Sequence, residues 1–274
     1  MSGHVASSGG PHRRFIVADV RPENYRTVTL VMRESLESQP GQFVMAWLPD
    51  VDERPYSIAG DDPLSLTVAR VGPFSASLYA LRPGDALWIR GPLGQGFALR
   101  GERILLAGGG YGVAPLLLLA RRAMADGIGV AACIGARTAE EVLLAESFEQ
   151  LGAAVRITTE DGSRGMRGLI TDAVQAEVAT HRPDAVYACG PVHMLEAVDR
   201  LCEAHCLPRQ LSWEAHMRCG IGLCGSCELP DPHRPDSRLS GVPHPGWLTC
   251  LDGPVSFMPD QDGESVTLAS VDSS

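Results

Sequence analysis

Three cysteines and three glycines occur within nine residues, CGIGLCGSC, at positions 219–227, and a further cysteine, Cys250, follows in WLTC. The spacing of Cys219, Cys224 and Cys227 is C-x4-C-x2-C, and with a distant fourth cysteine this is the pattern of plant-type [2Fe-2S] clusters. Structural zinc sites usually take their ligands from two short, well-separated pairs. The spacing therefore favours an iron–sulfur cluster as the group that these four thiolates bind.

The residues around the cysteines bear on the same choice. Gly220, Gly222 and Gly225 allow the chain to wrap closely, so that backbone N–H groups can point at sulfur. Zinc stays open as an alternative, because His233 or His244 could complete a Cys3His ligand set.

Composition limits where the chain works and what it binds. It has 274 residues, a formal net charge of −10 and 45% hydrophobic residues, which is typical of a globular chain of about two domains. The longest apolar stretch, 104–120, is interrupted by glycines and a proline, and residues 1–14 contain no apolar signal segment. We expect a cytoplasmic protein with no membrane span and no disulfides. The negative charge argues against nucleic acid or an anionic membrane as partner.

A glycine-rich turn follows the first strand expected after residue 100. LLAGGGYGVAP places Gly108, Gly109, Gly110 and Gly112 between that strand and a helix. Glycine permits close backbone approach, and a helix N-terminus offers N–H groups to phosphate, so the turn suits a pyrophosphate cofactor. The alternative is a tight turn that needs glycine for packing alone. The turn lacks the G-x-G-x-x-G order, and Arg137 stands where a standard dinucleotide-binding fold has an acidic residue.

A second turn, ACGPVHML, ends a later strand and carries Cys189, Gly190 and Pro191. Because ligands of open α/β sheets bind at the carboxyl ends of the strands, we expect these residues at the same sheet edge as the glycine turn. Taken alone, Cys189 would be interpreted as a small buried side chain.

An arginine, a tyrosine and a serine lie close together in ERPYSIAG. Arginine can fork onto a phosphate, and an aromatic ring can cover a planar heterocycle. Strand alternation places Arg54 and Tyr56 on one face and Ser57 on the other. Turns in RVGPFSASL (70–78) and GPLGQGF (91–97) could cradle a dinucleotide beside them.

Three regions, each with its own sequence pattern, contain the elements that must position these residues. Short β-type runs over 13–100 predict an antiparallel barrel, and strand–helix alternation over 101–212 predicts a parallel α/β domain. Residues 213–258 carry the cysteines without a regular period. The fold class is therefore α/β plus all-β with a small C-terminal domain. Helices are expected at 114–127, 140–152, 169–181 and 193–205, with a weaker helical signal near SASLYAL.

The motifs RPYS, GPLGQGF, GGGYGVAPL, TEDGSRGMRGLITD, YACGP and the cysteine segment follow one another in an order that resembles the ferredoxin–NADP reductase-like flavoproteins. The resemblance covers 13–258 and is greatest to the electron-transfer subunits of NAD-dependent dihydroorotate dehydrogenases. It implies an FAD-binding barrel over 13–100, an NAD(P)-binding domain over 101–212 and a [2Fe-2S] domain over 213–258.

The resemblance also implies roles for individual residues. Arg54 would hold the FAD phosphates, and Tyr56 and Ser57 would lie against the flavin ring, with Pro55 in the same motif. The pyrophosphate turn of FAD would include Val71, Gly72 and Ser75. The nicotinamide nucleotide would contact Gly109, Gly110, Gly112, Cys189, Gly190 and Pro191, and the cluster would be ligated by Cys219, Cys224, Cys227 and Cys250.

The implied function is electron transfer between NAD(H), FAD and the [2Fe-2S] cluster, with no catalytic side chain. The implied partner is an FMN-containing dihydroorotate dehydrogenase subunit of pyrimidine biosynthesis, in a heterotetramer. One alternative is the reductase subunit of another NAD(P)H-, ferredoxin-, sulfide- or hydrogenase-linked complex. It stays open because the segment 230–246 is longer than the family pattern. An alternative of another class is a nucleotide-binding protein with a structural cysteine–zinc site.

The choice between NADH and NADPH is ambiguous in the sequence. Arg137 could meet a 2′-phosphate, whereas Glu140 and Glu141 argue against one, and the resemblance favours NAD.

Two further pairs of residues have weaker signals. Cys202 and Cys206, with His205 between them, are expected to pack in the core rather than to bind a second metal. Asp161 and Gly162 fit either a plain turn or an adenosine contact.

Overall fold

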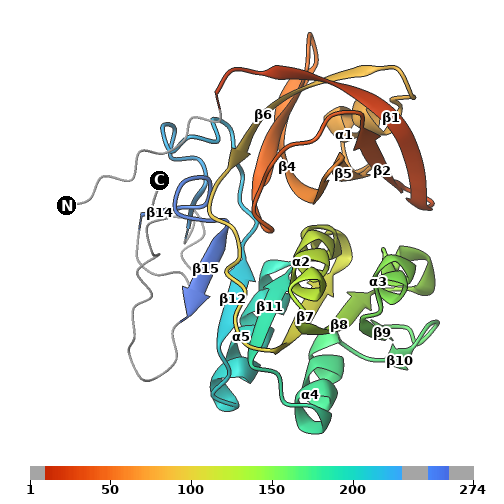
Figure 1. Cartoon of the computed structure of the whole chain (residues 1–274), viewed down its shortest axis with the longest axis vertical. Coiled ribbons are helices and arrows are strands. Elements are labelled where there is room, and N and C mark those ends of the chain that lie inside the picture. Colours follow the sequence, from red (N-terminus) through yellow and green to blue (C-terminus); the bar gives the residue numbers. More distant parts are fainter. Residues whose placement is uncertain (1–9, 230–245, 259–274) are drawn as a thin grey trace.

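The computed structural model describes residues 10–229 and 246–258, and its N-terminal half begins with a closed six-stranded antiparallel barrel (Figure 1). The strand order is β1-β2-β5-β4-β3-β6, closed by pairing of β6 with β1. The core is filled by inward-facing aliphatic side chains such as Leu30, Ile58 and Leu66. The elements are β1 (Arg13–Asn24), β2 (Thr27–Met32), β3 (Phe43–Leu48), β4 (Asp52–Asp61), β5 (Leu64–Ala69), α1 (Pro73–Tyr79) and β6 (Ala86–Leu93).

A seven-stranded sheet of order β10-β9-β8-β7-β11-β12-β15 follows the barrel. All neighbouring strands are parallel except β15, which pairs antiparallel with β12. The strands are β7 (Arg103–Gly109), β8 (Gly129–Ala136), β9 (Ala154–Thr159), β10 (Met166–Arg167), β11 (Ala185–Cys189), β12 (Arg209–Ser212) and β15 (Val255–Met258). The central strands are near-continuous apolar runs because helices cover both faces of the sheet.

The helices of this second body are α2 (Val113–Ala125), α3 (Ala145–Leu151), α4 (Ile170–Thr180) and α5 (Val192–Ala204). Side chains of α2 and α3 share one core with the sheet, and those of α4 and α5 share another. The fold class expected from the sequence is confirmed, and α1 contains most of the SASLYAL segment. The domain boundaries stay predictions; β6 ends at Leu93 and β7 begins at Arg103.

The helix expected over 140–152 is wrong in its first turn. A short 3-10 helix, η2 (Ala139–Glu141), comes first, and α3 begins only at Ala145. Leu144 has a left-handed backbone (φ 57°), which ends any continuous helix at this point. The segment before α3 is buried at all three of its residues, Val142, Leu143 and Leu144. Burial of these apolar side chains therefore sets the backbone path here instead of a continuous helix.

The barrel and the sheet are joined by contacts from several segments. Leu118 of α2 belongs to the apolar core of the barrel. Arg122 of α2 pairs with Asp61 of β4 at 2.5 Å. The Tyr187 hydroxyl of β11 donates to the Ala98 carbonyl at 2.9 Å, in the segment that links β6 to β7. These contacts place the barrel directly over α2 (Figure 1).

The C-terminal segment carries the cysteines and ends on the sheet. It contains a two-stranded ladder of β13 (Glu228–Leu229) and β14 (Trp247–Leu248) and then contributes β15 to the main sheet. Of the inserted stretch 230–246 only Gly246 is described, so His233 and His244 lie outside the described residues. In the part of the chain that is described, no helix combines the length and apolarity needed to cross a membrane.

Candidate functional site

A cavity of about 600 Å³ lies where the barrel meets the carboxyl ends of the parallel strands. This sheet edge is where open α/β folds bind ligands. Eight of the residues singled out in the sequence line it: Pro55, Ser57, Gly109, Gly110, Gly112, Cys189, Gly190 and Pro191. The structure therefore brings the glycine turn, the second turn and one face of β4 together around one space.

Two positions in the turn after β7, Gly112 and Gly110, favour glycine for different physical reasons. A Cβ on Gly112 would overlap the Cys189 carbonyl and lie 2.5 Å from the Gly190 nitrogen, so close packing alone excludes a side chain there. Gly110 has φ +53° and open space around its missing Cβ. The backbone at Gly110, just before α2, is therefore accessible to a ligand in the cavity.

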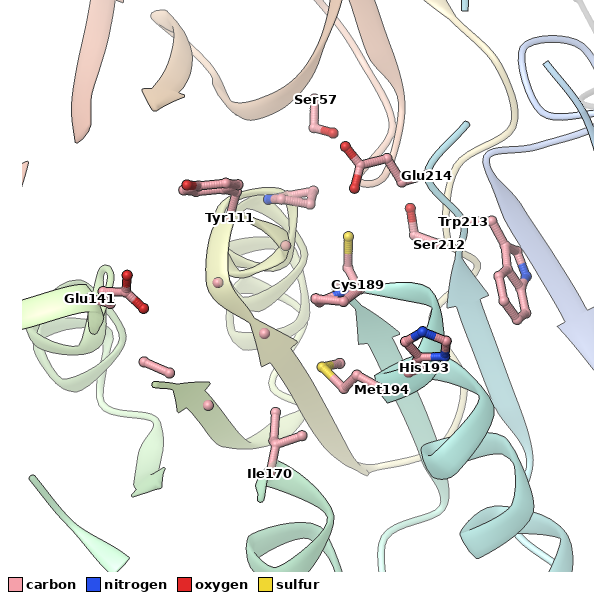
Figure 2. A pocket seen from close by; sticks show the side chains of 18 of the residues that line it. Ser57, Tyr111, Glu141, Ile170, Cys189, His193, Met194, Ser212, Trp213 and Glu214 are labelled. Atoms are coloured by element: carbon pink, nitrogen blue, oxygen red, sulfur yellow. The ribbon is translucent and has the colours of Figure 1, made fainter. Parts of the chain in front are cut away.

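One end of the cavity gathers four polar side chains (Figure 2). Cys189 is paired in the sheet with Ser212, whose side chain lies close enough to the thiol to act on its pKa. Glu214 and Ser57 line the cavity at this end as well. Burial raises the pKa of the Cys189 thiol to about 12, with the Glu214 carboxylate acting in the same direction, so Cys189 is a neutral thiol at neutral pH.

Ser212 and Glu214 were not predicted as site residues from the sequence. Neither lies in a recognisable motif, and their signal is only their place directly at the end of a parallel strand. The other end of the cavity has a second group of side chains, of which the sequence had singled out only Arg137 and Glu141: Arg26, Tyr111, Arg137, Glu141 and Glu160. Figure 2 shows Glu141 on the far side of the α2 N-terminus from Cys189.

The remaining barrel residues form a separate group outside this cavity. Arg54 pairs with Asp52 at 2.6 Å and is about 40% exposed; its phosphate role stays a prediction. Tyr56 lies with its ring 6.3 Å from that of Phe74 in α1. This contact brings β4 next to the turn that contains Val71, Gly72 and Ser75.

The turn before α1 presents an open surface. The Ser75 hydroxyl accepts hydrogen bonds from the backbone N–H groups of Val71 and Gly72, both at 2.9 Å, which fixes the turn. Val71 is 67% exposed, and a Cβ on Gly72 would meet nothing within 4 Å. An exposed apolar side chain beside an open glycine, with an arginine and an aromatic ring close by, fits the binding of a flavin dinucleotide.

The cysteine loop curls around its own sulfur atoms. Gly220, Gly222 and Gly225 have φ of +68°, +73° and +69°, so the backbone conformation requires glycine at all three. The N–H of Gly222 donates to Cys250 Sγ at 3.1 Å, and the N–H of Leu223 donates to Cys219 Sγ at 3.4 Å. N–H groups directed at sulfur suit ligand thiolates.

The four thiols fall into two pairs. Cys227 and Cys250 have their sulfurs 3.3 Å apart, and Cys219 lies close enough to Cys224 to lower the pKa of its thiol. Hydrogen bonds from Ser226, and then from Cys219, lower the pKa of Cys224 to about 6. The hydrogen bond between Cys227 and Cys250 lowers the pKa of Cys227 to about 7 and raises that of Cys250. The lowered pKa values of Cys224 and Cys227 favour the thiolate form, which is the form that binds a metal.

This arrangement bears on the choice between zinc and an iron–sulfur cluster. A zinc ion needs four ligands around one point, whereas a [2Fe-2S] cluster takes its four cysteines as two pairs on two irons. The donor set fits the cluster.

The other cysteines are not part of this site. All eight cysteines lie in the described residues, and all eight are free thiols there. Cys202 is buried in the core between α5 and the sheet, which confirms its predicted packing. Cys206 is exposed, so the same prediction is wrong for this residue; it follows the end of α5 with a left-handed backbone (φ 49°).

Asp161 and Gly162 lie in the turn after β9 and do not line the cavity. The Asp161 carboxylate accepts hydrogen bonds from the backbone N–H and the hydroxyl of Ser163, at 3.0 and 2.6 Å. These contacts favour the plain turn over an adenosine contact.

Two family models match the chain. Residues 106–200 match an oxidoreductase NAD-binding domain, and residues 214–258 match the iron–sulfur cluster binding domain of dihydroorotate dehydrogenase B. The fold is also similar to the solved structure of the NADH-dependent reduced ferredoxin–NADP oxidoreductase. That likeness has a TM-score of 0.76 at 25% identity and covers 94% of this chain and 90% of that chain.

Curated relatives are similar over most of their length. A protein of Thermococcus kodakarensis is 43% identical over 222 residues, which is 81% of this chain and 86% of the relative. One of Methanopyrus kandleri is 37% identical over 251 residues, 90% of each chain. Both are named dihydroorotate dehydrogenase B (NAD(+)), electron transfer subunit.

The closed barrel set against a parallel sheet, with a cavity between them, defines a reductase of the ferredoxin–NADP reductase-like class. Within that class the chain belongs to the family of dihydroorotate dehydrogenase B electron transfer subunits.

Proposed function

We propose that this chain transfers electrons between NAD(H) and a partner subunit by way of FAD and a [2Fe-2S] cluster. The observation that carries the proposal is the continuity between the cavity and the cysteine loop. Phe43 and Met217 line the cavity, and the same two side chains pack with Cys227 and Cys250 in one apolar cluster. One apolar cluster therefore connects the wall of the nucleotide cavity with two of the thiols.

The cavity is proposed to hold the nicotinamide dinucleotide along the strand ends. Gly110 and the first turn of α2 would receive the pyrophosphate, because the backbone there is open to the cavity. Cys189 and Ser57 would border the nicotinamide ring, since they lie at the end where the sheet meets the barrel. Gly190 and Pro191 would complete that wall, and Gly112 and Gly109 would act by packing the turn.

The outer face of β4 and the turn before α1 are proposed to hold FAD. Arg54 would exchange its contact with Asp52 for a phosphate, and Tyr56 would cover the flavin ring from the α1 side. Pro55 and Ser57 face the cavity on the opposite side of the strand, which would bring flavin and nicotinamide together at its edge. Val71, Gly72 and Ser75 would line the pyrophosphate turn.

The four cysteines are proposed to ligate the cluster, Cys219 with Cys224 and Cys227 with Cys250. FAD, when bound, exchanges two electrons with a nicotinamide and single electrons with a [2Fe-2S] centre. The chain's own contribution is to fix distances, to exclude water with Phe43 and Met217, and to supply N–H groups to the thiolates.

The proposed partner is an FMN-containing dihydroorotate dehydrogenase catalytic subunit, assembled with this chain as a heterotetramer. Support comes from the names of relatives that are up to 43% identical. The similarity to the ferredoxin–NADP oxidoreductase structure, at 25% identity, gives weaker support to the alternative of a different partner complex.

Co-expression with the catalytic subunit tests the proposal. We expect a tagged chain to retain that subunit, to contain FAD and FMN in equal amounts, and to reduce NAD+ with dihydroorotate. NADH–dye reduction without retention of the subunit would favour the reductase of another complex. Absence of both would contradict the proposal.

A further inference from the structure

The end of the cavity opposite Cys189 is dominated by one carboxylate. Glu141 closes the short helix η2 (Ala139–Glu141), and the buried run Val142–Leu144 that follows anchors it. Its side chain is only 13% exposed and lines the cavity (Figure 2). Glu140, one residue earlier, is exposed and does not line the cavity.

Glu141 binds two guanidinium groups from different bodies of the protein. Arg137, at the end of β8, donates from Nε at 2.9 Å and from Nη2 at 2.5 Å, in a forked contact. Arg26, in the turn between β1 and β2, donates from Nη2 to the same carboxylate at 2.8 Å. The Arg26 guanidinium also lies 5.6 Å from the centre of the Tyr111 ring, at the start of α2. Both arginines that line this end are thus already paired.

The charge at this end is balanced. The hydrogen bond from Arg137 holds the pKa of Glu141 below its ordinary value, so the carboxylate is ionised at neutral pH. Glu160 lines the same end and adds a second negative charge against the two arginines. A phosphate monoester carries about −1.5 to −2 charges and needs donors that are not already neutralised. An ionised carboxylate, in contrast, accepts hydrogen bonds from hydroxyl groups.

We infer that Glu141 makes this cavity select a dinucleotide whose adenosine ribose has a free 2′-hydroxyl over one with a 2′-phosphate. The inference rests on the proposed function, because the nicotinamide must lie at the Cys189 end for the adenosine to reach Glu141. Glu141 acts both by occupying Arg137, which could otherwise fork onto the phosphate, and by placing its own negative charge there.

Binding of two small probes to the FAD-loaded protein tests this inference. Calorimetry with ADP and with 2′,5′-ADP compares nucleotides that differ in the 2′-phosphate, and dye reduction with NADH and NADPH provides a second readout. In Glu141→Gln we expect the affinity ratio to shift by on the order of tenfold toward 2′,5′-ADP, because Arg137 is released. Glu140→Gln removes the same charge one residue away and should leave the ratio unchanged. Equal ratios in wild type and Glu141→Gln would overturn the inference.

Arg137→Gln is the second variant, and its exposed side chain makes the substitution safe for folding. In the wild-type background we expect 2′,5′-ADP binding within about twofold of normal, because Glu141 has already neutralised Arg137. In the Glu141→Gln background, Arg137→Gln should remove the gained affinity for 2′,5′-ADP. A large loss of 2′,5′-ADP binding in the single variant would show that Arg137 holds the phosphate in the native protein, which contradicts the inference. If the wild-type protein binds neither probe, it is the proposed function that fails.

Discussion

Arg90 of β6 donates from Nη2 to the backbone carbonyl of Cys219 at 2.9 Å. The contact joins the barrel to the first cysteine of the loop, across 129 residues of sequence. The Arg90 side chain is 13% exposed, and the same nitrogen also pairs with the Glu53 carboxylate at 3.2 Å. A buried positive charge is therefore fixed next to the cysteine loop.

Removing this charge should lower the reduction potential of the cluster. In Arg90→Met we expect a fall on the order of 50 mV, since a nearby positive charge stabilises the reduced form. Arg90→Lys keeps the charge and should restore most of the potential. EPR-monitored redox titration measures both, with Arg33→Met, at an exposed site just after β2, as the control. An unchanged potential in Arg90→Met would remove Arg90 from any role in setting it.

The cysteine assignment predicts a separation of two activities. Cys224→Ser should lose the iron–sulfur absorbance, while NADH–dye reduction stays within about twofold of wild type, because hydride transfer to FAD does not need the cluster. Cys206→Ser changes an exposed cysteine outside the loop and should alter neither property. Iron content and visible spectra measure whether each variant keeps the cluster. Full iron retention in Cys224→Ser would show that Cys224 is not a ligand.

Gly112 and Gly110 should respond differently to alanine. In Gly112→Ala the new Cβ would overlap the backbone at Cys189, which cannot move without disturbing β11, so we expect a loss of about 2 kcal/mol or more of unfolding free energy. Gly110→Ala meets no neighbour and pays only for its left-handed backbone, about 1 kcal/mol. Chemical denaturation measures the unfolding free energy of both variants. A larger loss in Gly110→Ala than in Gly112→Ala would contradict the prediction.

Tyr187 links the sheet to the segment after β6 and gives stability a pH dependence. Its hydroxyl donates to the Ala98 carbonyl and accepts from the Arg100 N–H, so Tyr187→Phe should lower the unfolding free energy by about 1–3 kcal/mol. Burial raises the pKa of Tyr187 from 10 to about 12. The folded chain then keeps a proton that the unfolded chain loses, so stability falls from pH 10 to about pH 12.

The Phe variant should flatten that decline, because it removes the titrating group. Tyr79→Phe is the matched control, since Phe keeps the ring contact that Tyr79 makes with the Arg70 guanidinium at 5.1 Å. Denaturation at pH 8, 10 and 11 measures the difference. Parallel pH profiles for wild type and Tyr187→Phe would contradict the assigned pKa.

Local features of the site could be predicted from the sequence. The cysteine loop depends on spacing and on three glycines within six residues, and their positive φ values are a property of those residues themselves. The strand–helix alternation similarly identifies the central strands, because burial on both faces requires continuous apolar runs.

Features that depend on long-range pairing could not be predicted. β15 has four residues, and its place at the sheet edge depends on Ser212 meeting Val255. Glu141 lines the cavity only because Leu144 breaks the expected helix and the preceding residues are buried. Ser212 and Glu214 join the site because strand β12 lies beside β11, a neighbourhood that no local motif encodes.

The most direct test of the electron-transfer assignment is a visible spectrum of anaerobically purified protein, with iron, acid-labile sulfide and zinc measured on the same sample. The four paired thiols and the flavin surface predict flavin bands over a broad iron–sulfur absorbance, with about two irons and two sulfides per chain. A colourless protein that contains one zinc per chain would contradict the assignment.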